Sequence, residues 1–237
     1  MTESKQESVE SLFQRGTELH ANGDFAAAAA LFRQANKLDP RHPEIWGNLG
    51  AATMALESYD EAERAFAKAL KLNPDFAIVH NNLGNLFRAQ GNVYKAEASY
   101  RRALKIDPRF AEAAANLGMV LIRKGGFQEA GQILEEGGKA GPNPGIYKGL
   151  GLLFEALRER EKAVEYFRKA LDLGPSDPEI LNNLGASLHG LGRIDEALDV
   201  LHQALRQDPN CVEVYQNLGT LFLTEGRYDE AVAIFQQ

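Results

Sequence analysis

The sequence has a single cysteine, Cys211, among its 237 residues. A lone cysteine excludes an internal disulfide framework and a thiolate zinc cluster. No apolar run comes near the length of about 18 residues that a membrane-spanning helix requires. Residues 1–10 are polar and lack the apolar segment of a signal peptide. We therefore expect a reduced, cytoplasmic protein with no membrane insertion.

Basic residues are too few for phosphate binding to be the main role of the surface. Lys and Arg total 26 while Asp and Glu total 33, so the formal net charge is −7. Binding to nucleic acids or to anionic membranes depends on a basic surface. The charge balance therefore argues against nucleic acid as a partner and against a polybasic membrane anchor.

Motifs that carry chemistry are also scarce. The five histidines show no metal-ligand spacing such as HExxH. The segment 137–141, GGKAG, resembles a phosphate-binding loop, but no Ser or Thr follows its lysine and no strand precedes it. Nothing around Cys211 suggests a catalytic pair. We expect a protein that is not an enzyme and that needs neither a cofactor nor a metal ion.

What the chain has is an internal repeat of about 34 residues. Leu-Gly pairs recur at steps of 34, 34, 33, 34 and 34 residues, an Ala follows each Gly by 12 residues, and a bulky residue follows that Ala by four. The glycines, including an earlier one preceded by Arg, are Gly16, Gly50, Gly84, Gly118, Gly151, Gly185 and Gly219. The prolines that close the repeats are Pro40, Pro74, Pro108, Pro142, Pro175 and Pro209.

This spacing resembles the tetratricopeptide repeat (TPR). Repeat two shows the pattern most fully, in Trp46, Leu49, Gly50, Tyr59, Ala62, Phe66 and Pro74. The resemblance implies an all-α fold, a right-handed superhelical solenoid of antiparallel helix pairs with the first helices on the concave wall. A polar tail, 1–8, precedes an array over 9–237. Its six full repeats and one partial repeat are 9–42, 43–76, 77–110, 111–143, 144–177, 178–211 and 212–237.

The apolar periodicity predicts how each helix pair packs. Repeat positions 4, 7, 8 and 11 share one face of the first helix, and positions 20, 24 and 27 share one face of the second. We expect Gly50 and Ala62 to let the helix backbones approach closely, and Phe66 to fill the space that remains. Asp177 before Pro178 predicts a helix N-cap with proline at the first helical position.

Repeat four departs from this pattern. Gly137 stands where other repeats have Ala, the repeat is one residue short, and the segment 141–145, GPNPG, follows. Each glycine inside a helix costs roughly 1 kcal/mol relative to alanine. We predict a frayed helix end, altered packing between repeats four and five, and a hinge at 137–145. The alternative is an irregularity that the array tolerates.

A polar stripe on the first helices is the candidate functional feature. Position 6 is asparagine in five repeats: Asn48, Asn82, Asn116, Asn183 and Asn217. Position 2 is glutamate in five: Glu10, Glu44, Glu112, Glu179 and Glu213. A carboxamide donates and accepts hydrogen bonds at once, so a ladder of them can pair with the backbone of an extended peptide. The glutamates would favour Lys or Arg on that peptide.

The motif Asn81-Asn82-Leu83-Gly84 recurs at residues 182–185. It is similar to the repeats of O-linked N-acetylglucosamine transferases and their bacterial relatives. In that family an asparagine ladder at this register holds substrate peptides. The resemblance implies the same role here, with Gly149 breaking the ladder in repeat five. Hydrogen bonding between neighbouring helices is the structural alternative.

Three further side chains are candidates at the edge of this stripe. Arg88 and Arg123 could reach the groove beside Asn85 and hold an acidic group of a ligand, or they could be solvated surface residues.

The main hypothesis is a non-catalytic scaffold that binds a protein or peptide ligand. The alternative is a substrate-recruiting arm of a glycosyltransferase or sulfotransferase that continues beyond Gln237.

The last repeat stops within its second helix, before its own proline. Ala231, Ile234 and Phe235 would then present apolar surface at this end. We expect either a natural protein that continues or an end that docks on another chain, which includes self-association of this protein.

Overall fold

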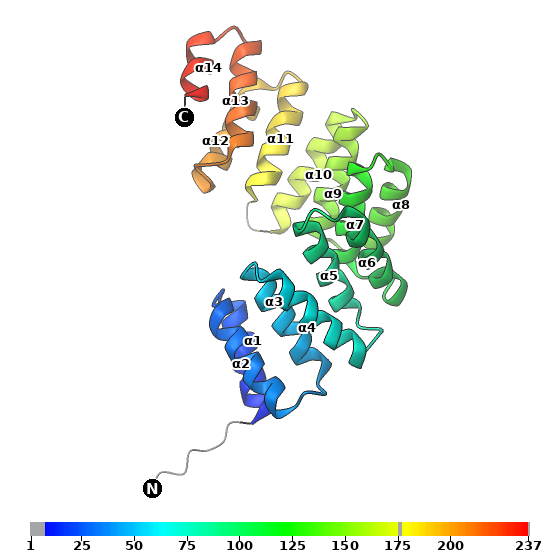
Figure 1. Ribbon diagram of the computed structural model, residues 1–237. Helices are drawn as coiled ribbons and strands as arrows, with labels where there is room; N and C mark the ends of the chain where they lie inside the picture. Colours follow the sequence, from blue (N-terminus) through cyan, green and yellow to red (C-terminus); the bar gives the residue numbers. More distant parts are fainter. Residues whose placement is uncertain (1–7, 175–176, 237) are drawn as a thin grey trace. The chain divides into compact units, whose positions relative to one another are not determined.

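The structure is a computed structural model that describes residues 8–174 and 177–236. Within these ranges the chain forms fourteen α-helices, arranged as successive antiparallel pairs, and no strand (Figure 1). The predicted all-α repeat solenoid is confirmed. The tail 1–7, Gln237 and Pro175, one of the recurring prolines, lie outside the described residues.

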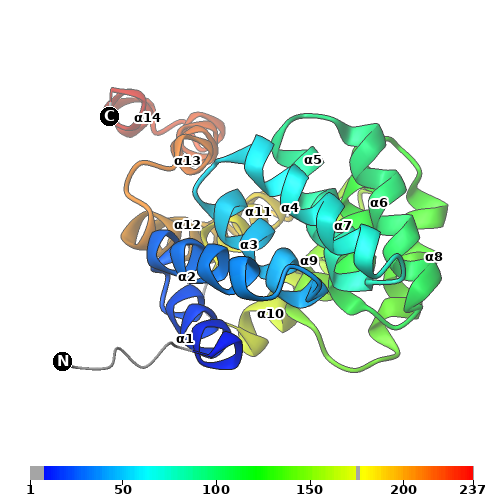
Figure 2. The ribbon, with the colours of Figure 1, turned by 60° about the horizontal axis from the view of Figure 1, so that its bottom comes forward.

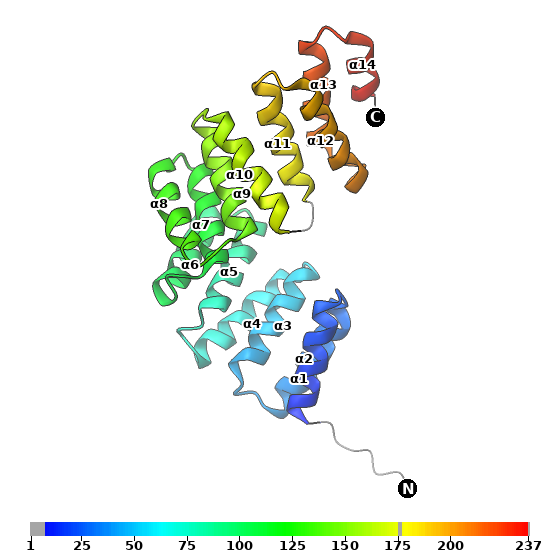
Figure 3. The same cartoon turned by 180° about the vertical axis from the view of Figure 1, so that it is seen from behind.

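The chain divides into two compact units, Met1–Pro108 and Arg109–Gln237. The helices of the first unit are α1 (Val9–Ala21), α2 (Phe25–Leu38), α3 (Pro43–Ala55), α4 (Tyr59–Leu72), α5 (Ala77–Ala89) and α6 (Val93–Ile106). Those of the second are α7 (Ala111–Arg123), α8 (Phe127–Gly138), α9 (Pro144–Ala156), α10 (Arg160–Leu173), α11 (Pro178–Gly190), α12 (Ile194–Gln207), α13 (Val212–Thr224) and α14 (Tyr228–Phe235). Figures 2 and 3 show the same helices from below and from behind.

Local sequence explains where several helices begin. The Asp177 side chain accepts from the Glu179 backbone N–H at 2.9 Å, and Pro178 follows as the first residue of α11. Asn143 caps α9 in the same way, accepting from the Ile146 N–H at 3.1 Å, and again proline follows. Proline suits this place because it has no N–H to leave unpaired there. The cap predicted at Asp177 is confirmed.

Glycine against a bulky residue is the packing unit of every helix pair. A methyl group on Gly50 would lie 2.5 Å from the Phe66 ring, far closer than van der Waals contact allows. The equivalent distance is between 2.1 and 2.7 Å in all seven pairs. The bulky partners that are fully buried are Phe32, Phe66, Tyr100, Leu134, Phe167 and Leu201. The close backbone approach predicted from the repeat is thus confirmed.

Repeat four differs from the others through close packing of three helices. Helix α8 has 12 residues where the other complete second helices have 14, and i→i+3 turns continue it to Gly141. A methyl group on Gly137 would lie 2.5 Å from Ala114 Cβ of α7, and one on Gly149 would lie 2.6 Å from Leu134 Cδ2 of α8. Gly137 thus lets α8 approach α7, and Gly149 lets α9 approach α8.

The packing between repeats four and five is altered, as predicted. Helix α9 contacts α7 more extensively than α8, whereas α3 and α11 pack mainly against the second helix of the pair before them. The segment 137–145 lies inside the second unit, and the division between units falls at Pro108/Arg109 instead. The hinge at 137–145 stays a prediction.

Candidate functional site

The predicted polar stripe lies on the first helices of the pairs. The five ladder asparagines are half-buried, on α3, α5, α7, α11 and α13. The glutamates at repeat position 2 are exposed in the first turns of α1, α3, α7, α11 and α13. Their exposed carboxylates and half-buried carboxamides therefore follow the same helices, but the structure brings only some of them together.

In the first unit, three predicted residues line one pocket of about 270 Å³. They are Glu44 and Asn48 of α3 and Asn82 of α5. The other residues that line it are mainly apolar: Phe13, Gly47, Phe76, Ile78 and Val79. We refer to these eight residues as the first-unit pocket. The apolar part of its wall was not predicted, because it combines side chains from three different repeats.

The two asparagines of the first-unit pocket differ in their hydrogen bonds. The Asn48 Nδ2 donates to the Glu44 backbone carbonyl at 3.0 Å, one turn earlier in α3. Among the described residues, the Asn82 carboxamide makes no hydrogen bond to another protein group. Asn82 can therefore offer both a donor and an acceptor to a ligand, whereas Asn48 offers its carbonyl oxygen.

In the second unit, Glu179, Asn183 and Glu213 line a larger pocket of about 610 Å³. The remaining lining residues are two acidic ones, Asp177 and Asp208, together with Asn182, Cys211, Leu152 and Pro178. We refer to these nine residues as the second-unit pocket. Four of its side chains are carboxylates, which makes this surface acidic.

Two ladder residues of the second unit already have protein partners. The Asn217 Nδ2 donates to Asn182 Oδ1 at 2.8 Å, which joins α13 to α11. This is the bond between neighbouring helices that the structural alternative predicts. The Asn183 Nδ2 donates to the Glu179 backbone carbonyl at 2.9 Å, as Asn48 does in the first unit. The ladder is thus not a row of equivalent side chains.

Lys148 is a charged residue at this surface that the sequence analysis did not single out. Its Nζ lies 3.1 Å from Asp177 Oδ2 and 2.5 Å from Glu179 Oε2. The lysine side chain is 15% exposed, so this ion pair is partly shielded from water. Position 5 of the repeats holds residues of every kind, so no sequence signal marked this one.

The other predicted residues lie outside both pockets. Asn85 Oδ1 accepts from the hydroxyl of the buried Tyr100 at 2.8 Å, which gives it a structural role within the third repeat. Arg88 and Arg123 are exposed in the last turns of α5 and α7. Glu112 and Asn116 lie on α7, the glutamate exposed and the asparagine half-buried.

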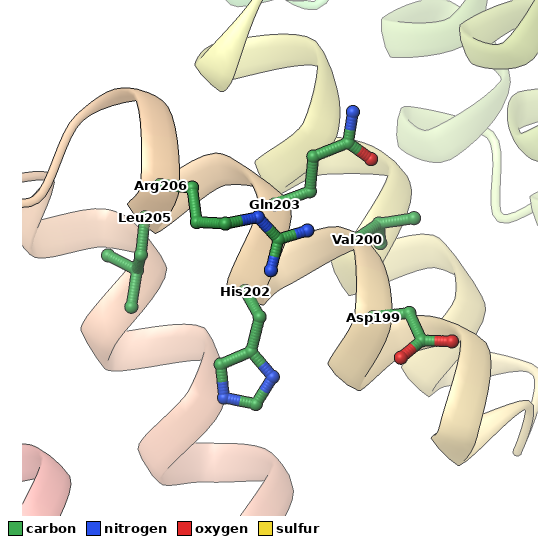
Figure 4. Close-up of a pocket in the computed structure, with 6 residues that line it drawn as sticks. All are labelled: Asp199, Val200, His202, Gln203, Leu205 and Arg206. Carbon is green, nitrogen blue, oxygen red and sulfur yellow. The ribbon is translucent and has the colours of Figure 1, made fainter.

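A third pocket, of about 550 Å³, lies along a second helix. All six lining residues belong to α12: Asp199, Val200, His202, Gln203, Leu205 and Arg206 (Figure 4). It contains no residue predicted from the sequence, and its side chains spread outward from a single helix. We therefore assign no function to it.

Burial lowers the pKa of His20 on α1, and other clear pKa shifts belong to ion pairs of the second helices. Arg33 of α2 forms a bidentate ion pair with Glu61 of α4, with N–O distances of 2.8 and 2.9 Å. This hydrogen bonding holds the pKa of the Glu61 carboxyl below its usual value. Arg168 of α10 and Glu196 of α12 form an ion pair at the same repeat positions, through a single contact of 2.7 Å. Arg193 and Arg168 together lower the pKa of Glu196.

The described residues show neither a metal-ligand cluster nor a membrane-spanning helix. Across the part of the chain that the structure describes, no three His, Cys, Asp or Glu side chains are grouped so that they could hold a metal ion. Of the described helices, none combines the length and apolar character needed to cross a bilayer.

Four models of the tetratricopeptide repeat family match the sequence, at residues 19–86, 77–110, 144–187 and 177–237. This chain belongs to the tetratricopeptide repeat family. Between residues 19 and 237 the models leave 111–143 unmatched, and this range corresponds to the irregular fourth repeat. The similarity to O-linked N-acetylglucosamine transferase repeats stays a prediction.

Several solved TPR-fold structures resemble this chain. PilF of Pseudomonas aeruginosa is 20% identical, with a TM-score of 0.72 over 88% of this chain and 95% of that one. PilW, a type IV pilus biogenesis factor, is 23% identical, with a TM-score of 0.73 over 88% and 97%. YrrB, described as a TPR protein with an unusual peptide-binding site, is 28% identical, with a TM-score of 0.53 over 73% and 89%. No curated protein sequence matches the chain.

Proposed function

We propose that this TPR protein is a non-catalytic scaffold that binds an extended segment of a partner protein against its first helices. The observation that carries the proposal is the first-unit pocket, where Glu44, Asn48 and Asn82 lie together. Family membership supports a protein-binding role, and so does the peptide-binding site ascribed to YrrB.

The asparagines suit recognition of a peptide backbone. Each peptide unit has one donor and one acceptor, and a carboxamide can pair with both. Asn82 has both groups available, and Asn48 in the neighbouring first helix has its carbonyl oxygen available. Because such pairing ignores side chains, the asparagines would supply affinity while other pocket residues supply sequence preference.

The second unit contributes a different surface under this proposal. Its pocket holds Asn183 and four carboxylates, of which Asp177 and Glu179 pair with Lys148 and Asp208 and Glu213 do not. Asn217 already donates to Asn182. This surface would favour a cationic part of the partner. Asn116 and Glu112 on α7 would extend the polar surface, and Arg88 and Arg123 would meet acidic groups outside the pockets.

Asn82→Ala is the sharpest test, because this substitution removes no hydrogen bond within the described protein. A lost backbone pair is worth about 0.5–1.5 kcal/mol, so each partner should bind roughly two- to tenfold more weakly. The measurement is a quantitative pull-down from native lysate, after circular dichroism has shown equal helicity.

Gln34→Ala on α2 is the matched control, since it removes an exposed carboxamide from a second helix. A variant in which all five ladder asparagines are alanine extends the test to both units. If this variant folds and retains the same partners as the wild type in the same amounts, the ladder is structural and the proposal is wrong.

A further inference from the structure

The first-unit pocket joins an apolar wall to a single carboxylate. Ile78 is 54% exposed although it is a large aliphatic residue, and Phe13 and Phe76 are only half-buried. Val79 closes the apolar wall from within the core. Glu44 is the one charged residue that lines the pocket. The wall therefore offers apolar surface that a bound side chain could remove from water.

Gly47 makes the space for such a side chain. A methyl group at this position would lie 3.1 Å from Val79 Cγ2 and 3.7 Å from the Phe76 ring. Any larger residue would therefore fill the pocket. Small-molecule sites have volumes of roughly 300–1,000 Å³. At about 270 Å³ the first-unit pocket falls below that range and suits one large side chain.

Glu44 has no ion pair or hydrogen bond from its carboxylate to any described residue. The chain itself shows what this register can bind. Glu179 stands at the same repeat position, and its carboxylate takes the Lys148 ammonium at 2.5 Å. Lys148 occupies position 5 of the preceding repeat. In repeat one that position is Phe13, so an aromatic ring replaces the ammonium and leaves Glu44 without a cation.

We propose that the first-unit pocket binds a partner segment in which a bulky apolar residue lies within two positions of Lys or Arg. The apolar side chain enters between Phe13, Phe76 and Ile78, and the cation pairs with Glu44. The segment's backbone passes over Asn48 and Asn82, so this assignment rests on the proposed function. It adds the sequence class of the ligand, which the ladder alone does not specify.

The probes are acetylated and amidated Ser/Ala peptides of six residues that carry one variable apolar site and one variable charged site. The apolar site is Phe or Ala, and the charged site is Lys or Glu, placed either next to it or one residue further along. Binding to the full chain is followed by ¹⁵N–¹H NMR titration. The Phe/Lys peptide should bind about tenfold more tightly than Ala/Lys. It should bind roughly two- to fivefold more tightly than Phe/Glu.

Two variants divide the site into its parts. Ile78→Lys changes an exposed residue, so it should leave folding intact while it weakens Phe/Lys binding about fivefold or more. Leu72→Lys on α4 is the matched control, since Leu72 is 40% exposed and does not line the pocket. Glu44→Gln should abolish the preference for Lys over Glu, whereas Glu135→Gln on α8 should preserve it.

The outcomes separate this assignment from the proposed function. Equal binding of the Phe and Ala peptides, or a Lys preference that survives in Glu44→Gln, would overturn the assignment. If all the peptides bind alike and Asn82→Ala removes that binding, the proposed function stands and the assignment is wrong. Sedimentation of this chain and of the Ile78→Lys variant tests for self-association. If the wild-type chain is a dimer and Ile78→Lys dissociates it, a second copy occupies the pocket and the assignment is likewise wrong.

Discussion

Asn36 on α2 is a polar side chain in an apolar position. It is 6% exposed, and neither atom of its carboxamide has a hydrogen-bond partner in the described part of the chain. The same repeat position holds Leu70, Leu104, Leu171 and Leu205 elsewhere. Burying an amide without a partner costs about 1–3 kcal/mol by protein mutational data, so Asn36 lowers the stability of the first repeat.

Asn36→Leu should therefore raise the free energy of unfolding by about 1–2 kcal/mol, because it removes the unpaired amide and restores the residue common at this position. Urea unfolding followed by circular dichroism measures the change. Gln34→Leu, on the exposed face of the same helix, should change stability by less than about 0.5 kcal/mol. A less stable Asn36→Leu protein would show that the amide is satisfied by bound water.

At the scale of the element, helix α8 contains two interior glycines whose surroundings differ. A methyl group on Gly131 would meet only Leu153 Cδ2, at 3.4 Å, which is ordinary contact. A methyl group on Gly137 would lie 2.5 Å from Ala114 Cβ. Glycine lowers helix stability relative to alanine at both positions. Of the two, only Gly137 is required for the close approach of α7 and α8.

Gly131→Ala should stabilise the protein by about 0.5–1 kcal/mol, since alanine is the better helix former. Gly137→Ala should destabilise it by about 1–3 kcal/mol, because the added methyl group overpacks the junction. Each variant serves as the control for the other in urea unfolding. If both substitutions stabilise the protein, the packing between α7 and α8 adjusts to the added methyl group, and the close contact at Gly137 is not required.

The hinge predicted at 137–145 can be measured on the wild-type protein. Close packing of α9 on α7 and α8 gives this segment more partners than the glycines alone suggest. A hinge requires weaker amide-exchange protection across 131–145 than in the other second helices. Equal protection there would contradict the hinge and leave repeat four as a tightly packed irregularity.

At the scale of the whole molecule, negative charge is the common feature of both candidate surfaces. The chain has a net charge of −7, the first-unit pocket has Glu44 and the second-unit pocket has four carboxylates. Each unit thus carries its own pocket, and both would favour a basic ligand. Electrostatic attraction of this kind falls as salt shortens the screening length.

Retention of partners in the pull-down should therefore fall between 0.1 M and 1 M NaCl, where the screening length drops from about 10 Å to about 3 Å. A variant with Glu44→Gln and Glu213→Gln should bind less at 0.1 M and respond less to salt. Both glutamates are exposed, so these changes should leave folding intact. Retention that is unchanged or stronger at 1 M would indicate that apolar contacts dominate binding.

The repeat, the helix pairs and the buried face of each helix follow from the amino-acid sequence alone. Helical periodicity is local, so the spacing of Gly50, Ala62 and Phe66 was sufficient to predict their packing. The cap at Asp177 was predictable for the same reason, because the side chain bonds to a backbone group two residues away.

Which polar side chains have hydrogen-bond partners depends on how the repeats pack against each other. Asn82 makes no side-chain hydrogen bond to the described residues, while Asn217 bonds to Asn182, although both stand at the same repeat position. The salt bridge from Lys148 to Glu179, the apolar wall around Ile78 and the approach of α9 to α7 are equally absent from the repeat pattern. These contacts join different repeats, so they depend on how neighbouring helices shift and rotate against each other. The periodicity of the sequence predicts which face of each helix is buried, but it does not predict how far neighbouring helices shift and rotate.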